Sequence, residues 1–128
     1  MNRDAFEKQV EQVLAGLPDE FAGRLRNLVF LVEEWADAGT LESVGFDRPE
    51  ELLGFFDGIP LTDRTHDLVE TSPARILLFQ GAIEEESRLG GLPLRRVIRE
   101  TLWHEIAHYF GFSEEEMERI EELWAGDG

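Results

Sequence analysis

Cysteine is absent from this chain of 128 residues. Its absence excludes disulfides, thiolate metal sites and cysteine nucleophiles together, and it leaves export to an oxidising compartment without support. Long apolar runs are also missing, since no segment approaches the ~20 apolar residues that a membrane-spanning helix requires. No apolar signal region follows the first residues. We therefore expect a cytoplasmic protein without a membrane partner.

Basic side chains are few. The sequence has 12 Lys and Arg against 28 Asp and Glu, which gives a formal net charge of −16. A phosphate backbone or an anionic membrane surface would be repelled, so we expect no nucleic-acid partner and no membrane binding. The same negative charge raises the local concentration of divalent cations, which is compatible with a metal site.

The apolar content is sufficient for a folded core, because 42% of the residues are hydrophobic, including nine Phe and three Trp. Repeats, low-complexity segments and long linkers are missing, so residues 1–128 are expected to form one domain. The order of predicted elements is helix, strands, helix, helix. This order predicts an α+β fold with a small sheet and with helices at both termini.

The elements follow from apolar periodicity and from glycine and proline. A helix with Phe6, Val10 and Val13 on one face is predicted to end at Gly16, and a short helical turn is expected within 19–28. Apolar runs predict strands over 28–32, 51–56 and 75–80, whereas 36–50 and 61–73 resemble loops. A long helix is expected from Pro93 to about Phe110, followed by a stop at Gly111 and by a last helix that begins with a Ser113–Glu116 capping box.

One motif in the long helix carries chemistry: His104-Glu105-Ile106-Ala107-His108. Residues four apart on a helix point the same way, so both imidazoles can reach one cation at ~2.0–2.1 Å. Glu105 lies about 100° further round the helix, where it can accept a proton from water. A zinc ion at such a site lowers the pKa of bound water towards ~7 for attack on a carbonyl.

The alternative interpretation of the motif is an ordinary core in which the two histidines bond to backbone or carboxylate groups. The surrounding residues 101–112 are mostly large and apolar. Burial of imidazole and carboxylate groups among them would be costly without polar partners. A shared cation would satisfy all three side chains, and the metal interpretation is therefore favoured.

Zinc requires a third protein ligand. Gly111 allows the chain to turn back after His108, and the next carboxylate belongs to Glu114. Glu115 and Glu118 are competing candidates, whereas Glu116 is expected to be engaged in the capping box. Glu114 also suits a structural role, because acidic residues are favoured in the first turn of a helix.

The run His104-Glu105-x-x-His108-x-x-Gly111-x-x-Glu114 resembles the HExxHxxGxxD signature of Asp-zincins. Most of the chain resembles the small bacterial minimal zincins, a metallopeptidase-like family. The resemblance also includes the segments 17–21, 53–62 and 75–79 and the strand around Val29. The departure is Glu114, where the family pattern has Asp; the longer side chain changes the reach of this ligand by one methylene.

The resemblance implies a zincin fold in which the motif helix lies under a small mixed sheet. It implies His104 and His108 as metal ligands, Glu105 as general base, and an edge strand, assigned here to Ile76–Phe79, that pairs with an extended peptide. The substrate class that it implies is a peptide or protein.

The other polar residues are expected to have no role in the site. His66 is expected to be a solvated loop residue, and Tyr109 is expected to pack in the core. Arg88, Arg95, Arg96 and Arg99 are expected to balance the glutamates at 84–86 and 100 on an exposed helical face.

Two functional hypotheses remain. The first is a zinc-dependent metallopeptidase in which His104, His108 and Glu114 hold Zn²⁺ and Glu105 activates water. The second is a non-catalytic zincin-like module that binds a metal or a peptide, or acts as a regulatory partner. The small size favours the second, since a chain of this length leaves little material for a second lobe beside the cleft. The metallopeptidase is nevertheless the function that we predict, with the non-catalytic module as the alternative. Manganese or iron would suit the same ligands nearly as well as zinc.

Overall fold

The computed structural model describes residues 1–17, 25, 28–58, 74–113, 115–119 and 122. Most of the helical turn expected within 19–28, the expected loop 61–73 and the last part of the C-terminal helix lie outside the described residues. Each described helix is too short or too polar to span a bilayer.

The first and the motif-bearing helices agree with their sequence patterns. Helix α1, Arg3–Ala15, begins at Asn2, whose side chain accepts a hydrogen bond from the Ala5 N–H at 2.8 Å. Helix α5, Leu94–Phe110, begins directly after Pro93. It ends at Gly111, which has the left-handed φ of 73° that a side chain would disfavour. The predicted end of α1 and the predicted bounds of α5 are confirmed.

Within the described residues, the sheet has three strands in the order β1-β3-β2. Strand β1, Leu28–Glu33, runs parallel to β3, Ala74–Phe79, and β2, Gly54–Asp57, runs antiparallel to β3. The edge-strand assignment of Ile76–Phe79 is therefore wrong, because β3 is the central strand. Strand β2 lies at the edge beside α5 instead. Strand order depends on contacts between distant segments, so local sequence patterns do not determine it.

Two elements differ from expectation between the first two strands. The segment 36–50, expected as loop, contains helix α3, Ala38–Val44. Asp37 begins it by accepting a hydrogen bond from the Thr40 N–H at 2.7 Å, which lowers the pKa of this carboxyl group. The predicted strand 51–56 begins three residues late, because Pro49–Glu51 form a 3₁₀ helix.

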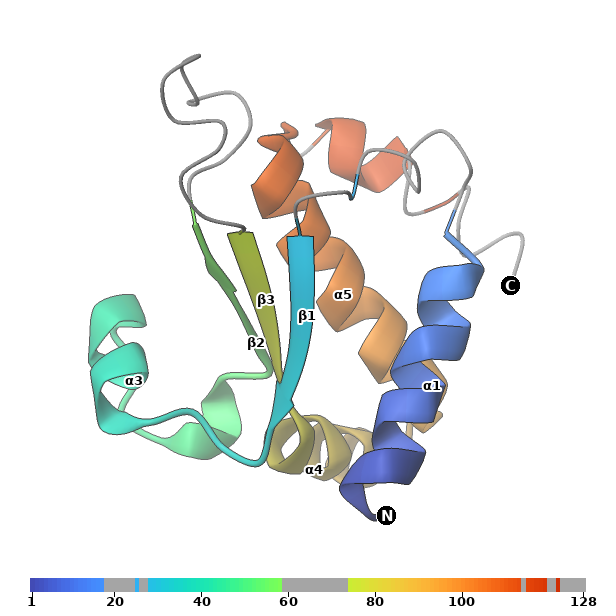
Figure 1. The fold of residues 1–128 in the computed structure, drawn as a ribbon. Helices are drawn as coiled ribbons and strands as arrows, with labels where there is room; N and C mark the ends of the chain where they lie inside the picture. Colours follow the sequence, from blue (N-terminus) through green and yellow to red (C-terminus); the bar gives the residue numbers. More distant parts are fainter. Residues whose placement is uncertain (18–24, 26–27, 59–73, 114, 120–121, 123–128) are drawn as a thin grey trace.

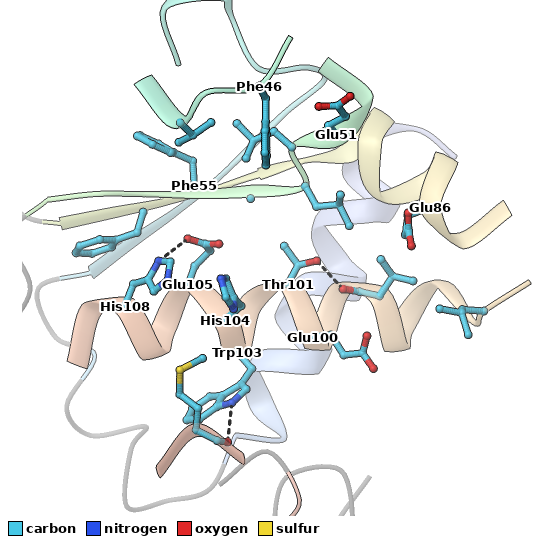
Figure 2. A pocket seen from close by; sticks show the side chains of 18 residues that line it. Phe46, Glu51, Phe55, Glu86, Glu100, Thr101, Trp103, His104, Glu105 and His108 are labelled. Carbon is cyan, nitrogen blue, oxygen red and sulfur yellow. Dashed lines mark hydrogen bonds and ion pairs between the residues drawn. The ribbon is translucent and has the colours of Figure 1, made fainter. Parts of the chain in front are cut away.

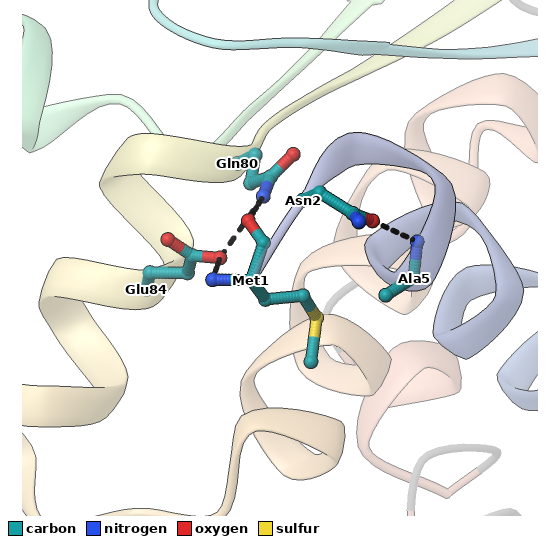
Figure 3. Close-up of polar contacts among 5 residues, drawn as sticks. All are labelled: Met1, Asn2, Ala5, Gln80 and Glu84. Carbon is teal, nitrogen blue, oxygen red and sulfur yellow. Dashed lines mark hydrogen bonds and ion pairs between the residues drawn. The ribbon is translucent and has the colours of Figure 1, made fainter.

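Helix α4, Gln80–Gly90, is not predicted as a separate element. It follows β3 without a connecting loop. The Gln80 Nε2 donates to the Met1 carbonyl oxygen at 2.8 Å and to Glu84 Oε1 at 3.0 Å (Figure 3). The expected strand over 75–80 is confirmed up to Phe79, and its last residue starts the helix.

The elements form layers around the sheet (Figure 1). Helices α1 and α5 cover one face and α3 lies on the other. The larger core lies between the sheet and α5, and it includes Phe6, Ile76, Leu78 and Trp103, each at most 1% exposed. A smaller core of Ala36, Leu41, Leu52, Phe79 and Ala82 lies under α3. The α+β fold with a small mixed sheet packed on the motif helix is confirmed.

The segment after α5 is fixed to that helix by hydrogen bonds. Ser113 and Glu116 form the predicted capping box, in which the Glu116 N–H donates to Ser113 Oγ at 3.2 Å and the Ser113 N–H donates to Glu116 Oε1 at 3.3 Å. The indole N–H of Trp103 donates to the Met117 carbonyl oxygen at 3.2 Å. Residues 115–119 are helical.

Candidate metal centre

The two histidines of the motif lie side by side on the surface of α5 that faces β2 (Figure 2). Their ring centroids are 4.6 Å apart and the rings are inclined by 63°. Both residues are exposed, whereas most of the residues around them in α5 are buried. The helical period explains the difference, because Trp103, Ile106 and Ala107 point into the core and positions 104 and 108 point away from it.

Glu105 is the buried member of the motif, at 6% exposure. Its side chain lies between α5 and β2, where Gly54 leaves room for it: a Cβ at position 54 would lie 3.2 Å from Glu105 Cγ. Glu105 Oε1 lies 3.3 Å from His108 Nδ1. This hydrogen bond raises the pKa of the His108 imidazole, and the partial burial of the ring opposes the shift.

The three side chains fit a divalent cation by their donor chemistry. One ligand atom from each of His104, Glu105 and His108 lies within 4.8 Å of the others. The two imidazoles are ligands that suit zinc, manganese or iron, and a carboxylate beside them can either complete the ligand set or accept a proton from a nearby water. Within the described part of the chain, this cluster is the group whose geometry suits a metal ion.

The proposed third ligand, Glu114, lies outside the described residues, and so does His66. The competitors are described: Glu115 and Glu118 are exposed, and Glu116 is engaged with Ser113, as expected. The identity of the third ligand stays a prediction.

A groove of about 620 Å³ opens above the cluster. Its floor is the α5 surface that carries the motif, and its opposite wall is β2 with the segment that precedes it (Figure 2). The groove continues past the edge of β2 to Phe46, which follows α3, and to Glu86 on α4. The His108 side chain is 50% exposed there. Solvent and a ligand therefore have access to the histidine rings.

The remaining candidates have structural roles among the described residues. Tyr109 is 2% exposed and packs edge-on against Phe56 with ring centroids 6.1 Å apart, which confirms core packing. Arg96 pairs with Glu100 at 3.0 Å and Arg88 pairs with Glu85. Charge balance is confirmed for these two arginines.

The sequence patterns did not identify Gly54 or Phe46 as part of this site. An isolated glycine in a strand often marks a close approach of another element, and Gly54 gives this signal. No comparable signal exists for Phe46, because its place in the groove depends on how α3 packs against the sheet.

One of two comparisons with known proteins gave a match. A comparison with curated proteins gave no match. The model of a family described as "Zincin-like metallopeptidase" matches residues 25–124, which includes the sheet, the motif helix and most of the segment after it. The chain therefore belongs to the zincin-like metallopeptidase family.

Proposed function

We propose that this protein is a zinc-dependent metallopeptidase in which His104 and His108 bind the metal and Glu105 is the general base. The observation that carries the proposal is the convergence of two exposed imidazoles and one buried carboxylate on a groove that solvent can enter. A cluster sealed in the core would hold an ion but would not admit a substrate. Family membership supports the same class of reaction.

The metal needs a further protein ligand, and we assign it to Glu114 by the spacing of the motif. When bound, zinc supplies Lewis-acid polarisation of a carbonyl and a water of lowered pKa. The protein residues supply the proton transfers. Glu105 accepts the proton of the attacking water and delivers it to the leaving amine.

Burial of Glu105 serves this role. The side chain is held between the α5 backbone and Gly54, so the carboxylate occupies one position at the edge of the groove. A base held in place by its surroundings loses little entropy when the reaction begins. His108 contacts the same carboxylate at 3.3 Å, which limits its rotation further.

The substrate is proposed to be an extended peptide that adds to the outer edge of β2. Within the described sheet, β2 pairs with β3 alone, and residues 54–56 of this strand line the groove. An extended peptide can bind such an edge by main-chain hydrogen bonds and place alternate side chains in the adjoining hollows. This binding mode would bring its backbone across the face of the cluster.

Two measurements test the proposal. Protein purified without a chelating column is expected to contain about one zinc ion per chain, as a two-histidine, one-carboxylate site requires, and His104→Ala is expected to lose it. Glu105→Gln is expected to keep the metal and to stop cleavage of an unbiased peptide library. A metal-free wild type at physiological zinc would contradict the metal site. Equal cleavage by wild type and Glu105→Gln, or none by either, would favour the non-catalytic module.

A further inference from the structure

The charged side chains of the groove share one sign. Besides Glu105, its described lining contains three carboxylates and no Lys or Arg: Glu51, Glu86 and Glu100. They come from the 3₁₀ helix before β2, from α4 and from α5, and all three are exposed. Figure 2 shows them around the end of the groove that lies away from His108.

No Lys or Arg of α5 belongs to the described groove lining, although Arg96 pairs with Glu100, which does. The α5 residues that line the groove are mostly three or four positions apart: Val97, Glu100, Thr101, Trp103, His104, Glu105 and His108. Arg95 and Arg96 lie in the same turns on other sides, where Arg95 bonds to Gln9 and Arg96 to Glu100. Among the ion pairs of the described residues, Glu51 and Glu86 have no basic partner. These two carboxylates face the groove with their charge uncompensated.

The groove also has an apolar wall. Val44 and Phe46 are each 38% exposed although they are large and hydrophobic, and both line the groove. Leu92 and Val97 line it beside α4 and α5. Exposed apolar side chains bordered by charged groups of one sign are typical of a surface that binds a ligand of opposite charge.

From this arrangement we infer that the groove selects peptides that carry a Lys or Arg side chain next to a large apolar side chain, with Glu51, Glu86 and Glu100 as specificity-determining residues. The apolar side chain lies against Phe46 and Val44, and the cationic group lies among the three carboxylates. The inference rests on the proposed function, since it names the substrate class of the same site. The net charge of −16 would also speed the approach of such a peptide.

Peptide binding tests the inference without relying on turnover. The zinc-loaded Glu105→Gln protein is titrated with labelled peptides of equal length that contain Phe with Arg, Phe with Glu, or Ser with Arg. The Phe–Arg peptide is expected to bind most tightly. Combining Glu51→Gln, Glu86→Gln and Glu100→Gln is expected to weaken its binding about fivefold to tenfold, because each exposed charge pair contributes a factor of about two.

A matched control separates the groove from the overall charge. Glu7→Gln, Glu11→Gln and Glu34→Gln remove the same three charges at exposed positions outside the groove lining. This control is expected to bind the Phe–Arg peptide as the parent protein does. High salt is expected to remove the preference for Arg over Glu, since the Debye length falls to ~3 Å at 1 M ionic strength.

The outcomes for this inference and for the proposed function are distinguishable. Equal binding of the Arg and Glu peptides, no binding of any peptide, or an equal loss in the control variant would overturn the inference. Cleavage of a library by wild type without any preference for basic residues would overturn it and leave the peptidase intact. Selective binding without cleavage by wild type would support the inference and contradict the peptidase.

Discussion

Replacing Gly54 with alanine tests whether the close approach of β2 to α5 positions the proposed base. A Cβ at this position would lie 2.8 Å from Thr101 Cγ2, 3.2 Å from Glu105 Cγ and 3.3 Å from the Leu77 carbonyl oxygen. Carbon atoms prefer separations of ~3.5–4.0 Å, so strand and helix must separate by nearly 1 Å. Overpacking of this kind costs about 1–3 kcal/mol in the free energy of unfolding.

The threonine cannot easily rotate away from the added methyl group. Its Oγ1 donates to the Val97 carbonyl oxygen at 2.8 Å, and β-branched side chains have few rotamers in a helix. Loss of that hydrogen bond would cost about 1 kcal/mol. The strain therefore passes to Glu105, and a displacement near 1 Å at a catalytic group lowers the rate by about 100-fold.

A second substitution makes this prediction specific. Thr101→Ser removes Cγ2 and keeps the hydroxyl that bonds to Val97, so Gly54→Ala with Thr101→Ser is expected to regain much of the lost stability and activity. The two effects should be non-additive by about 0.5–3 kcal/mol in urea unfolding. Gly39→Ala is the control, because its Cβ would meet only Asp37 Oδ1 at an ordinary 3.6 Å. Additive effects, or a Gly54→Ala protein as stable and active as wild type, would refute the reasoning.

Three further predictions concern the metal centre and its support. In zinc-free protein, Glu105→Gln is expected to lower the pKa of His108 measured by NMR titration, because the hydrogen bond to the carboxylate raises it. Because this contact raises the pKa of His108 in the folded state, it stabilises the zinc-free fold in full below the ordinary histidine pKa of about 6.5. Its contribution to the free energy of unfolding is lost as the pH rises through the pKa of His108 in the folded state. Urea unfolding across this range, with Glu105→Gln as control, measures the effect, and parallel curves for the two proteins would contradict it. Trp103→Phe is expected to destabilise the fold by at least about 1 kcal/mol, because it removes the hydrogen bond to the Met117 carbonyl; hydrogen exchange should increase first in residues 115–119. Zinc at 100 times its dissociation constant is expected to add about 2.7 kcal/mol to the unfolding free energy of wild type and nothing to that of His104→Ala.

The sequence predicted the elements whose own residues carry a regular pattern. The apolar spacing of Phe6, Val10 and Val13 and the glycine at 111 located α1 and the end of α5. Helix α3 was not predicted because it is short and buries a single residue, Leu41, so it has no apolar periodicity. Its signals were the caps alone: an acidic residue before it and a glycine after it.

The site was predictable as a set of residues and not as a shape. Positions 104, 105 and 108 follow from one helical turn, and the structure brings them together. The burial of the carboxylate depends on where β2 lies, because Glu105 is covered by Gly54, a residue that is distant from it in the sequence. The charge and apolar pattern of the groove has the same origin, since its walls come from separate parts of the chain.

The junction between β3 and α4 has a consequence for how the groove adapts. Phe79 and Gln80 pass from strand to helix with no spare residue, the Phe79 N–H donates to the Leu53 carbonyl at 2.9 Å, and the Gly81 N–H donates to the Glu34 carbonyl at 2.9 Å. A side chain at Gly81 would collide with the indole of Trp35 at 2.5 Å, so this corner is also closely packed. Helix α4, which carries Glu86 at the groove, is thus held closely against the sheet. We expect ligands of different bulk to be accommodated on the side of Phe46, because this residue follows a short helix that buries a single residue, Leu41.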